Sequence, residues 1–355
     1  MAEAAYDLAI IGAGVIGLFT ALFGSRQKGR ILVLEPWRIG DSRAASFSLT
    51  RSIRNDYLDP FYARLAFEAR KLWLDFQAES REPFLIECGC LNIARVSVTP
   101  DLSQTYAEQS HRVLHGLGLR THAFDRGGLR ERFPQFDADI GRLDVEAGLL
   151  YVPPITASLL ARLQTAGVTL EQATPVERIH RRAGRIVIET AAGERLADRL
   201  VIASGLGSND LLARIDGCQL QLPLRPDRPS ESKYFTPGVK IGYYNPPEVR
   251  RQTTSVTSVQ SFVSQCMPAL ADARVLDVEG VDQCSYDLVA DDNFILGPIP
   301  GVPGASIGTG WRGTGYKFAP IIGRTLSELA FDGTSREDIS RFTPERFVRS
   351  HAGQE

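Results

Sequence analysis

The stretch Tyr6-Asp7-Leu8-Ala9-Ile10-Ile11-Gly12-Ala13-Gly14-Val15-Ile16-Gly17 decides the fold of the first part of this chain. An apolar strand runs into a GxGxxG turn, and a helical run follows to about Phe23. Gly12 permits a tight turn, Gly14 lets the backbone approach a pyrophosphate, and Gly17 lets helix and strand pack closely. The N–H groups at the helix N-terminus then point at the phosphates. The pattern predicts a dinucleotide-binding unit.

A second apolar run, from Ile31 to Leu34, supports this interpretation because it ends in Glu35. A carboxylate at the end of the second strand can accept both hydroxyls of an adenosine ribose. The alternative is a strand, turn and helix with chance glycines, and the strand, helix and acid together disfavour it. The motif by itself leaves open whether the dinucleotide is NAD or FAD.

Composition excludes several other classes of function. The chain has 355 residues, enough for two domains, and a formal net charge of −2, which gives no basis for binding nucleic acid or an anionic membrane. Its five cysteines form no CxxC pair, which favours a reduced, cytoplasmic protein. His111 and His115 have metal-ligand spacing but no companion glutamate or third ligand, so no metal site is expected.

Strand and helix patterns alternate along the chain, which predicts the α/β class. Four further segments carry candidate chemistry. They are Ser46-Phe47-Ser48-Leu49-Thr50-Arg51-Ser52-Ile53-Arg54, Gly238-Val239-Lys240-Ile241-Gly242-Tyr243, Cys284-Ser285-Tyr286, and Gly310-Trp311-Arg312-Gly313-Thr314-Gly315-Tyr316-Lys317-Phe318. In this order, and over nearly the whole chain, they resemble the D-amino-acid-oxidase-like flavoenzymes, specifically the monomeric sarcosine oxidase and N-methyltryptophan oxidase branch.

The resemblance implies FAD as the cofactor and a discontinuous FAD-binding domain of the Rossmann-like, GR2 type. We expect this domain to comprise residues 1–82, 146–217 and 285–345. An interleaved α+β substrate domain, built on a mixed or antiparallel sheet, is expected at residues 83–145 and 218–284. We expect this domain to be shortened near residues 227–238, where the resemblance implies more strand.

The resemblance also implies roles for single residues. Cys284 matches the cysteine that links covalently to the 8α-methyl of FAD, and Lys240 matches the lysine by flavin N5 that helps O2 accept an electron. Arg54 and Lys317 match the pair that holds a substrate carboxylate. Arg51 matches an arginine close to the flavin ring. Each role has a simpler alternative. Cys284 could be an ordinary buried thiol, Lys240 a solvated lysine on a strand, and Arg51 and Arg54 a pair of surface charges.

Tyr286 matches an active-site tyrosine, and the aromatic residues Phe47, Tyr244 and Trp311 favour a substrate larger than sarcosine. Phe47 and Tyr244 stand where this branch has histidines. The glycine-rich loop at residues 310–315 precedes a helix, whose N-terminus suits a flavin that becomes negative on reduction. The complete expected FAD contacts are Gly12, Gly14, Val15, Ile16, Gly17, Glu35, Ser48, Thr50, Arg51, Val176, Gly205, Cys284, Gly313, Thr314, Gly315, Tyr316 and Lys317.

The expected activity is FAD-dependent oxidation of a secondary amine or amino acid, an N-methyl or cyclic imino acid, with O2 as the acceptor. Hydride transfer to flavin N5 gives an imine, and reoxidation gives H2O2. The alternatives are a flavin-dependent dehydrogenase, a biosynthetic tailoring oxidase acting on a larger amine, and a shortened flavin-binding protein without oxidase activity. A monomer with a small-molecule amine substrate, and with neither a nucleic-acid nor a membrane partner, is expected.

Overall fold

The computed structural model describes residues 5–27, 29–80, 82–97, 99–235, 239–244, 267, 270, 275–276 and 283–348. Within these ranges only the backbone is described at residues 226–235, 239–244, 275–276 and 283–286. The chain forms two compact units. The first comprises Met1–Phe47, Pro154–Asp227 and Ser285–Glu355, and the second comprises Ser48–Pro153 and Arg228–Cys284.

The first unit is built on a mixed six-stranded sheet in the order β18-β19-β13-β1-β2-β9. All neighbouring pairs are parallel except β18 with β19. Its elements are β1 (Leu8–Ile11), α1 (Val15–Ser25), β2 (Ile31–Leu34), α5 (Val152–Thr165, which begins in the second unit), β9 (Thr169–Glu171), β10 (Val176–Arg182), β11 (Arg185–Thr190), β12 (Gly193–Ala197), β13 (Leu200–Ile202), α6 (Ser208–Leu212), β18 (Ile295–Pro298), β19 (Ala305–Thr309) and α9 (Ala319–Asp332).

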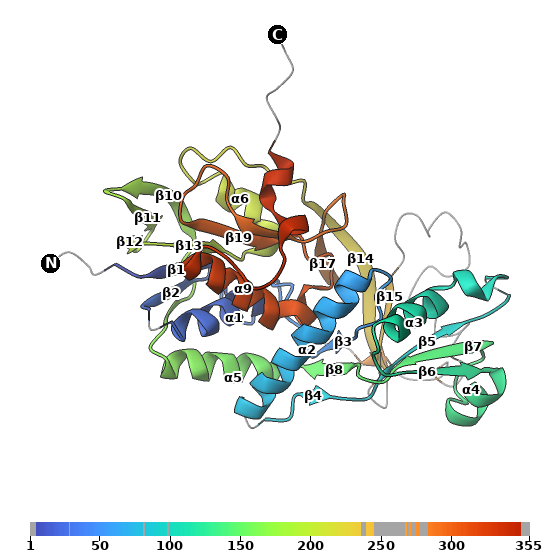
Figure 1. Ribbon diagram of the computed structural model, residues 1–355. Helices are drawn as coiled ribbons and strands as arrows, with labels where there is room; N and C mark the ends of the chain where they lie inside the picture. Colours follow the sequence, from blue (N-terminus) through green and yellow to red (C-terminus); the bar gives the residue numbers. More distant parts are fainter. Residues whose placement is uncertain are drawn as a thin grey trace, which may run out of the picture. The chain divides into compact units, whose positions relative to one another are not determined.

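Alternation of side chains along the buried strands gives this sheet two apolar faces. One face packs against α1 and α9, which lie side by side in Figure 1 and approach closely where Gly323 meets Phe19. The other face packs against the antiparallel sheet β10-β11-β12 through one continuous apolar core. Both faces are therefore covered, and the polar loops are left at the strand ends.

The second unit is built from small sheets, and the strand pairs within β15-β14-β16, β3-β8-β4 and β5-β7-β6 are all antiparallel. Its elements are β3 (Thr50–Ile53), α2 (Pro60–Ser80), β4 (Leu85–Ile86), β5 (Cys90–Ala94), α3 (Tyr106–Gly116), β6 (Thr121–Asp125), α4 (Arg126–Arg132), β7 (Ile140–Asp144), β8 (Gly148–Tyr151), β14 (Arg225–Phe235), β15 (Val239–Tyr244), β16 (Val275–Leu276) and β17 (Gln283–Leu288), with β14 and β17 crossing the unit boundaries. The predicted α/β class with a Rossmann-like nucleotide domain is confirmed.

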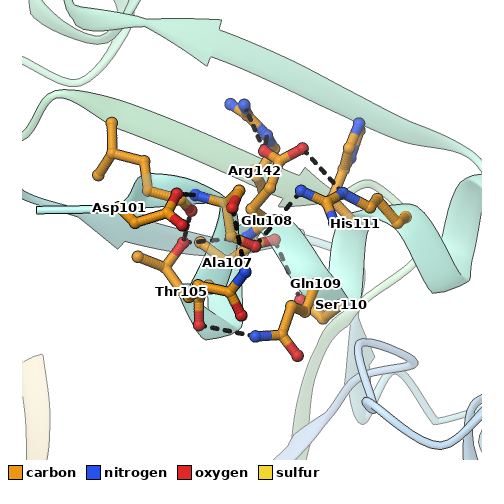
Figure 2. A network of polar contacts seen from close by, with 12 residues as sticks. Asp101, Thr105, Ala107, Glu108, Gln109, Ser110, His111 and Arg142 are labelled. Atoms are coloured by element: carbon orange, nitrogen blue, oxygen red, sulfur yellow. Dashed lines mark hydrogen bonds and ion pairs between the residues drawn. The ribbon is translucent and has the colours of Figure 1, made fainter. Parts of the chain in front are cut away.

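Polar contacts join α3 to the sheet β5-β7-β6, as Figure 2 shows. The Arg142 guanidinium donates to Glu108, with 2.8 Å between Nε and Oε2. His111 Nδ1 lies 2.9 Å from Thr121 Oγ1. Burial, with a further contribution from the charge of Arg142, lowers the pKa of His111. The first of the two metal-spaced histidines therefore belongs to a hydrogen-bond network that orients α3.

Two expectations need correction. The chain has more strand between Pro226 and Gly238 than the sequence pattern predicts, because β14 runs over eleven residues from Arg225 to Phe235 and pairs with β15 and β16. The β14 backbone pairs with β15, which follows it directly in the chain, and with β16 from farther along. The expected shortening of this segment relative to the family stays a prediction. The sequence Cys88-Gly89-Cys90 predicts two buried thiols on one face of an extended strand, and this prediction is wrong. Gly89 has a φ of +75°, Cys88 is exposed and β5 begins only at Cys90.

The predicted domain boundaries assign some segments to FAD binding and the others to the substrate domain. This assignment stays a prediction. The compact units divide the chain differently, because residues 48–82 and 146–153 belong to the second unit and residues 218–227 to the first. Among the described helices, none is long and apolar enough to cross a membrane.

Candidate functional site

The candidate site lies in the first unit, at the carboxyl ends of four neighbouring parallel strands, β19, β13, β1 and β2. The chain leaves β1 toward β2 on one side, while β13 pairs on the other, so β1 and β13 flank a topological switch point. Ligands of open α/β sheets bind at such points, outside the carboxyl ends of the strands. Glycine turns follow three of these four strands, and Glu35 follows the fourth.

The turn after β1 is shaped by two glycines that accept no side chain. Gly12 has a φ of +108°, and a Cβ there would lie 2.5 Å from the carbonyl oxygen of Ala203. A Cβ on Gly17 would lie 1.9 Å from the carbonyl oxygen of Gly12. Since both obstacles are backbone atoms, neither can move without moving a strand end. The turn thus holds α1 against β1.

The N-terminus of α1 is available to an anion. Its N-cap is Gly14 in an extended conformation, which provides no side-chain cap, and its first turn carries no acidic residue. The Val15 N–H donates to Ser46 Oγ at 3.0 Å, from a loop 31 residues farther along the chain. The remaining N–H groups and the positive end of the helix dipole suit a pyrophosphate. Sequence reasoning missed Ser46, although its serine-rich surroundings were a usable signal.

Glu35 lies beside this turn. Its Oε2 accepts the Ala13 N–H at 2.7 Å, and its Oε1 accepts the Trp37 N–H at 3.2 Å. A carboxylate has about four acceptor positions, so two remain for the hydroxyls of a ribose. This cradle fits the adenosine and pyrophosphate portion of a dinucleotide. It combines a glycine turn, a helix N-terminus whose own N-cap residue has no side chain, and one acid.

We expect Glu35→Gln to weaken FAD binding by about 10- to 100-fold, because hydrogen bonds to a charged acceptor contribute about 1.5–3 kcal/mol. Fluorescence titration of apoprotein with FAD, in a Cys284→Ser background, measures this. Glu171→Gln is the matched control, since Glu171 pairs with Arg195 at 2.8 Å and accepts nothing from the turn. Equal affinities of the Glu35 and Glu171 variants would contradict the role of Glu35.

The glycine-rich loop at residues 310–315 follows β19 and leads into α9. Trp311 packs edge-on against Phe294 with 5.3 Å between ring centroids, so part of its ring belongs to the core of the first unit. Arg312 has a φ of +53° and pairs with Asp292 at 2.8 Å. Lys317 is 5% exposed, and its Nζ lies 5.9 Å from the Phe318 ring centroid. A buried cation directly before a helix is consistent with a bound anion.

The predicted carboxylate-binding arginine, Arg54, lies in the second unit and already has an acidic partner. Its Nη1 bonds Asp56, and it lies 2.8 Å from Tyr106 Oη. The carboxylate of Asp56, which is 1% exposed, also accepts from Asn92. Burial opposes the charge of Arg54, but Asp56, Tyr57 and Tyr106 raise the pKa of the guanidinium well above its ordinary value. Asp56 and Tyr106 carried no motif signal and were missed.

The other predicted residues stay predictions. Ser48, Thr50 and Arg51 lie at or beside β3, and the Ser48 hydroxyl donates to the Thr50 carbonyl at 3.0 Å. Val176 begins β10 with its side chain buried in the core. Lys240 and Tyr244 lie on β15, and Cys284 and Tyr286 on β17, but their side chains lie outside the described part of the structure.

Gly205, Gly313, Thr314 and Tyr316 are brought toward the same carboxyl edge, because residues 205–207 follow β13 and residues 310–318 follow β19. Within the described ranges, no group of three or more His, Cys, Asp or Glu side chains could hold a metal ion.

Comparison with known proteins gives one matching family model, related sequences and similar solved structures. The family model described as "FAD dependent oxidoreductase" matches residues 7–329. The chain is 26% identical to the peroxisomal sarcosine oxidase of Homo sapiens over 96% of both chains. It is 24% identical to the N-methyl-L-tryptophan oxidase of Salmonella dublin over 96% of this chain and 99% of the other. The structure of L-proline dehydrogenase from P. horikoshii matches with a TM-score of 0.82 at 18% identity, covering 97% of this chain and 98% of that one.

Proposed function

Because this chain belongs to the FAD dependent oxidoreductase family, we propose that it oxidises a secondary amine or amino acid that carries a carboxylate. An N-methyl amino acid or a cyclic imino acid is the substrate class. The observation that carries the proposal is the match, over nearly the full length of both chains, to relatives named as sarcosine oxidase and N-methyl-L-tryptophan oxidase. The cradle at the carboxyl edge of the sheet supports FAD as the cofactor.

The first unit holds the cofactor in this proposal. Gly12, Gly14 and Gly17 shape the turn, and the α1 N-terminus with Ser46 receives the pyrophosphate. Glu35 accepts the ribose hydroxyls. FAD, when bound, supplies the chemistry of accepting a hydride from the carbon beside the amine nitrogen and passing the electrons to O2, so that the products are an imine and H2O2.

The remaining residues bind substrate and oxygen. Arg54 and Lys317 hold the substrate carboxylate, since an arginine fork and an ammonium together match its charge and geometry. Arg51 lies by the ring system, and Tyr286 and Tyr244 line the substrate site. Lys240 stabilises the negative charge that develops on oxygen, which is electrostatic catalysis. No histidine is required, because hydride transfer from a neutral amine needs no strong base.

Anaerobic mixing with N-methyl amino acids and cyclic imino acids tests the activity. We expect at least one of them to bleach the flavin spectrum, and air to restore it with release of H2O2. Lys240→Met should slow reoxidation by about 10²-fold or more while leaving bleaching nearly unchanged. Bleaching that only an artificial acceptor reverses would indicate a dehydrogenase. A flavin that no amine bleaches would indicate a flavin-binding protein without this activity.

We also propose that the flavin is covalently bound through Cys284. Acid precipitation should leave the yellow colour in the pellet of the wild type and release it to the supernatant from Cys284→Ser. Cys218→Ser is the control, because Cys218 packs against the core of the first unit and its pKa is raised by burial. Yellow supernatants from all three proteins would exclude the covalent link.

We further propose a cytoplasmic monomer. Cys88 and Cys218 are thiols and form no disulfide, which supports a reducing compartment. Gel filtration with light scattering at micromolar concentration measures the oligomeric state, and a mass of twice 39.0 kDa would contradict the proposal.

A further inference from the structure

Two residues hold one end of the Arg54 guanidinium inside the second unit. Its Nη1 donates to the Asp56 carboxylate and lies 2.8 Å from Tyr106 Oη. The Tyr106 hydroxyl donates to the backbone carbonyl of Asp56. A guanidinium can only donate and a carbonyl can only accept, so Tyr106 Oη accepts from Arg54 and gives its single hydrogen to Asp56. Arg54, Tyr106 and Asp56 therefore form a closed ring of hydrogen bonds.

Two aromatic rings lie beside the same guanidinium. Arg54 Cζ is 5.0 Å from the centroid of the Tyr57 ring and 5.9 Å from that of Tyr106. A cation within about 6 Å of an aromatic ring is attracted to it. The rings and the hydrogen bonds of Nη1 together restrict a long side chain that would otherwise sample many rotamers. Tyr106 contributes to this through both its hydroxyl and its ring.

The partners of Arg54 are themselves held by secondary structure. Asp56 is 1% exposed, and its carboxylate accepts from Asn92 Nδ2 on β5. Tyr106 is the first residue of α3. The Glu108–Arg142 ion pair, which Figure 2 shows, joins α3 to β7 with 2.6 Å between Oε2 and Nη2. Tyr106 and Asp56 thus place Arg54 relative to a packed helix and sheet.

The other nitrogens of Arg54 are left for a ligand. Its Nε and Nη2 make no hydrogen bond to any residue in the part of the chain that the structure describes, where Nη1 makes all of its contacts. The side chain is 26% exposed. Nε and Nη2 form one edge of the guanidinium, and two parallel N–H groups on such an edge match the two oxygens of a carboxylate.

We propose that Tyr106 is a positioning residue for Arg54, and that its hydroxyl on Nη1 directs the Nε–Nη2 edge toward the substrate carboxylate. Tyr106 acts through Arg54 and requires no contact with the substrate. The proposal rests on the proposed function, in which Arg54 binds the carboxylate. It adds a residue that no motif in the sequence marks.

The consequence is selectivity for a carboxylate over the corresponding carboxamide. A carboxylate offers two acceptor oxygens to the Nε–Nη2 edge, whereas a carboxamide offers one acceptor oxygen and a donor nitrogen. A guanidinium that is free to turn still attracts a negative charge but loses the paired hydrogen bonds. Tyr106→Phe should therefore raise the KM for a carboxylate-bearing amine and leave kcat nearly unchanged, because the reacting C–H bond is not involved.

Calorimetric titration of the oxidised FAD enzyme tests the proposal without turnover. The probes are methoxyacetate and tetrahydrofuran-2-carboxylate, which carry an ether oxygen where an N-methyl or cyclic imino acid has its nitrogen, each with its carboxamide. We expect Tyr106→Phe to weaken binding of both carboxylates by about 10-fold, since a hydrogen bond to a charged group is lost. Binding of the carboxamides should stay as in the wild type.

Tyr6→Phe is the matched control. Tyr6 also lies beside an arginine, with Arg30 Cζ 4.9 Å from its ring centroid, but it precedes the amino end of β1 in the first unit. This variant should bind both kinds of probe as the wild type does. Tyr106 is 40% exposed, so Tyr106→Phe should unfold at the same urea concentration as the wild type. Equal weakening of carboxylates and carboxamides would show a structural role and overturn the proposal.

Arg54→Met separates a failure of this proposal from a failure of the proposed function. It should weaken carboxylate binding by about 100-fold. If Arg54→Met loses this affinity while Tyr106→Phe binds like the wild type, Arg54 is the carboxylate site but Tyr106 does not position it. If neither variant changes carboxylate binding, or if the wild type binds no carboxylate, both the positioning role and the proposed carboxylate site are wrong.

Discussion

Gly17→Ala is expected to abolish retention of FAD during purification. The new Cβ would lie 1.9 Å from the Gly12 carbonyl oxygen and 3.0 Å from the carbonyl carbon, both backbone atoms. The start of α1 must then move away from β1, and its N–H groups leave the position that receives the pyrophosphate. Overpacking against an immobile neighbour costs about 3 kcal/mol or more, which is about 100-fold or more in affinity. Flavin absorbance per protein and titration of apoprotein with FAD measure the loss.

Gly116→Ala is the matched control for this substitution. Gly116 ends α3, and a Cβ there meets nothing within 4 Å. Alanine is the better helix former by up to about 1 kcal/mol, so this variant should keep its flavin and unfold no earlier than the wild type. If Gly17→Ala retains flavin as well as Gly116→Ala does, the N-terminus of α1 does not form the phosphate site.

Arg54→Met is expected to have two separable effects. It should raise the KM for a carboxylate-bearing amine by about 100-fold, because a charge-assisted contact to the substrate is lost. It should also destabilise the second unit by about 3 kcal/mol, because Asp56, at 1% exposure, loses its charge partner. Steady-state kinetics and urea unfolding measure the two effects.

The double variant Arg54→Met/Asp56→Asn separates them. Removing both charges should restore most of the stability while leaving KM high, because the stability effect comes from the uncompensated Asp56 and the kinetic effect from the missing cation. Arg43→Met is the control, since Arg43 is 60% exposed in its pair with Asp41 and should change stability by less than about 1 kcal/mol. A double variant with normal KM would show that Arg54 serves only the fold.

Local chemistry made the nucleotide turn predictable. Gly12, Gly14, Gly17 and Glu35 act within one strand-turn-helix-strand unit, and each residue type follows from a steric or hydrogen-bonding requirement of that unit. The structure brings Glu35 to the turn as expected, with its carboxylate on the Ala13 N–H. The alternation of strand and helix also sufficed to assign the α/β class.

Residues that act through distant partners could not be predicted in this way. Ser46 caps α1 from a separate loop, Asp56 pairs with Arg54 inside the second unit, and Asp287 reaches Thr309 and Gly310 across two strands. Asp56 and Asp287 belong to no motif, and Ser46 lies in a candidate segment that predicted no role for it. The strand β14 was missed because its prolines and charged residues hide a strand pattern, although β15 follows it directly and β16 pairs with it from farther along the chain.

The sequence by itself determined the nucleotide-binding βαβ unit, the α/β class and the family resemblance, because these depend on spacings of a few residues and on the order of motifs along the chain. The tertiary structure decided which polar groups compensate one another. Burial makes an unpaired charge or hydroxyl costly, so partners such as Asp56 for Arg54 and Thr309 for Asp287 are selected by contact between folded elements. Such contacts leave no local spacing in the sequence.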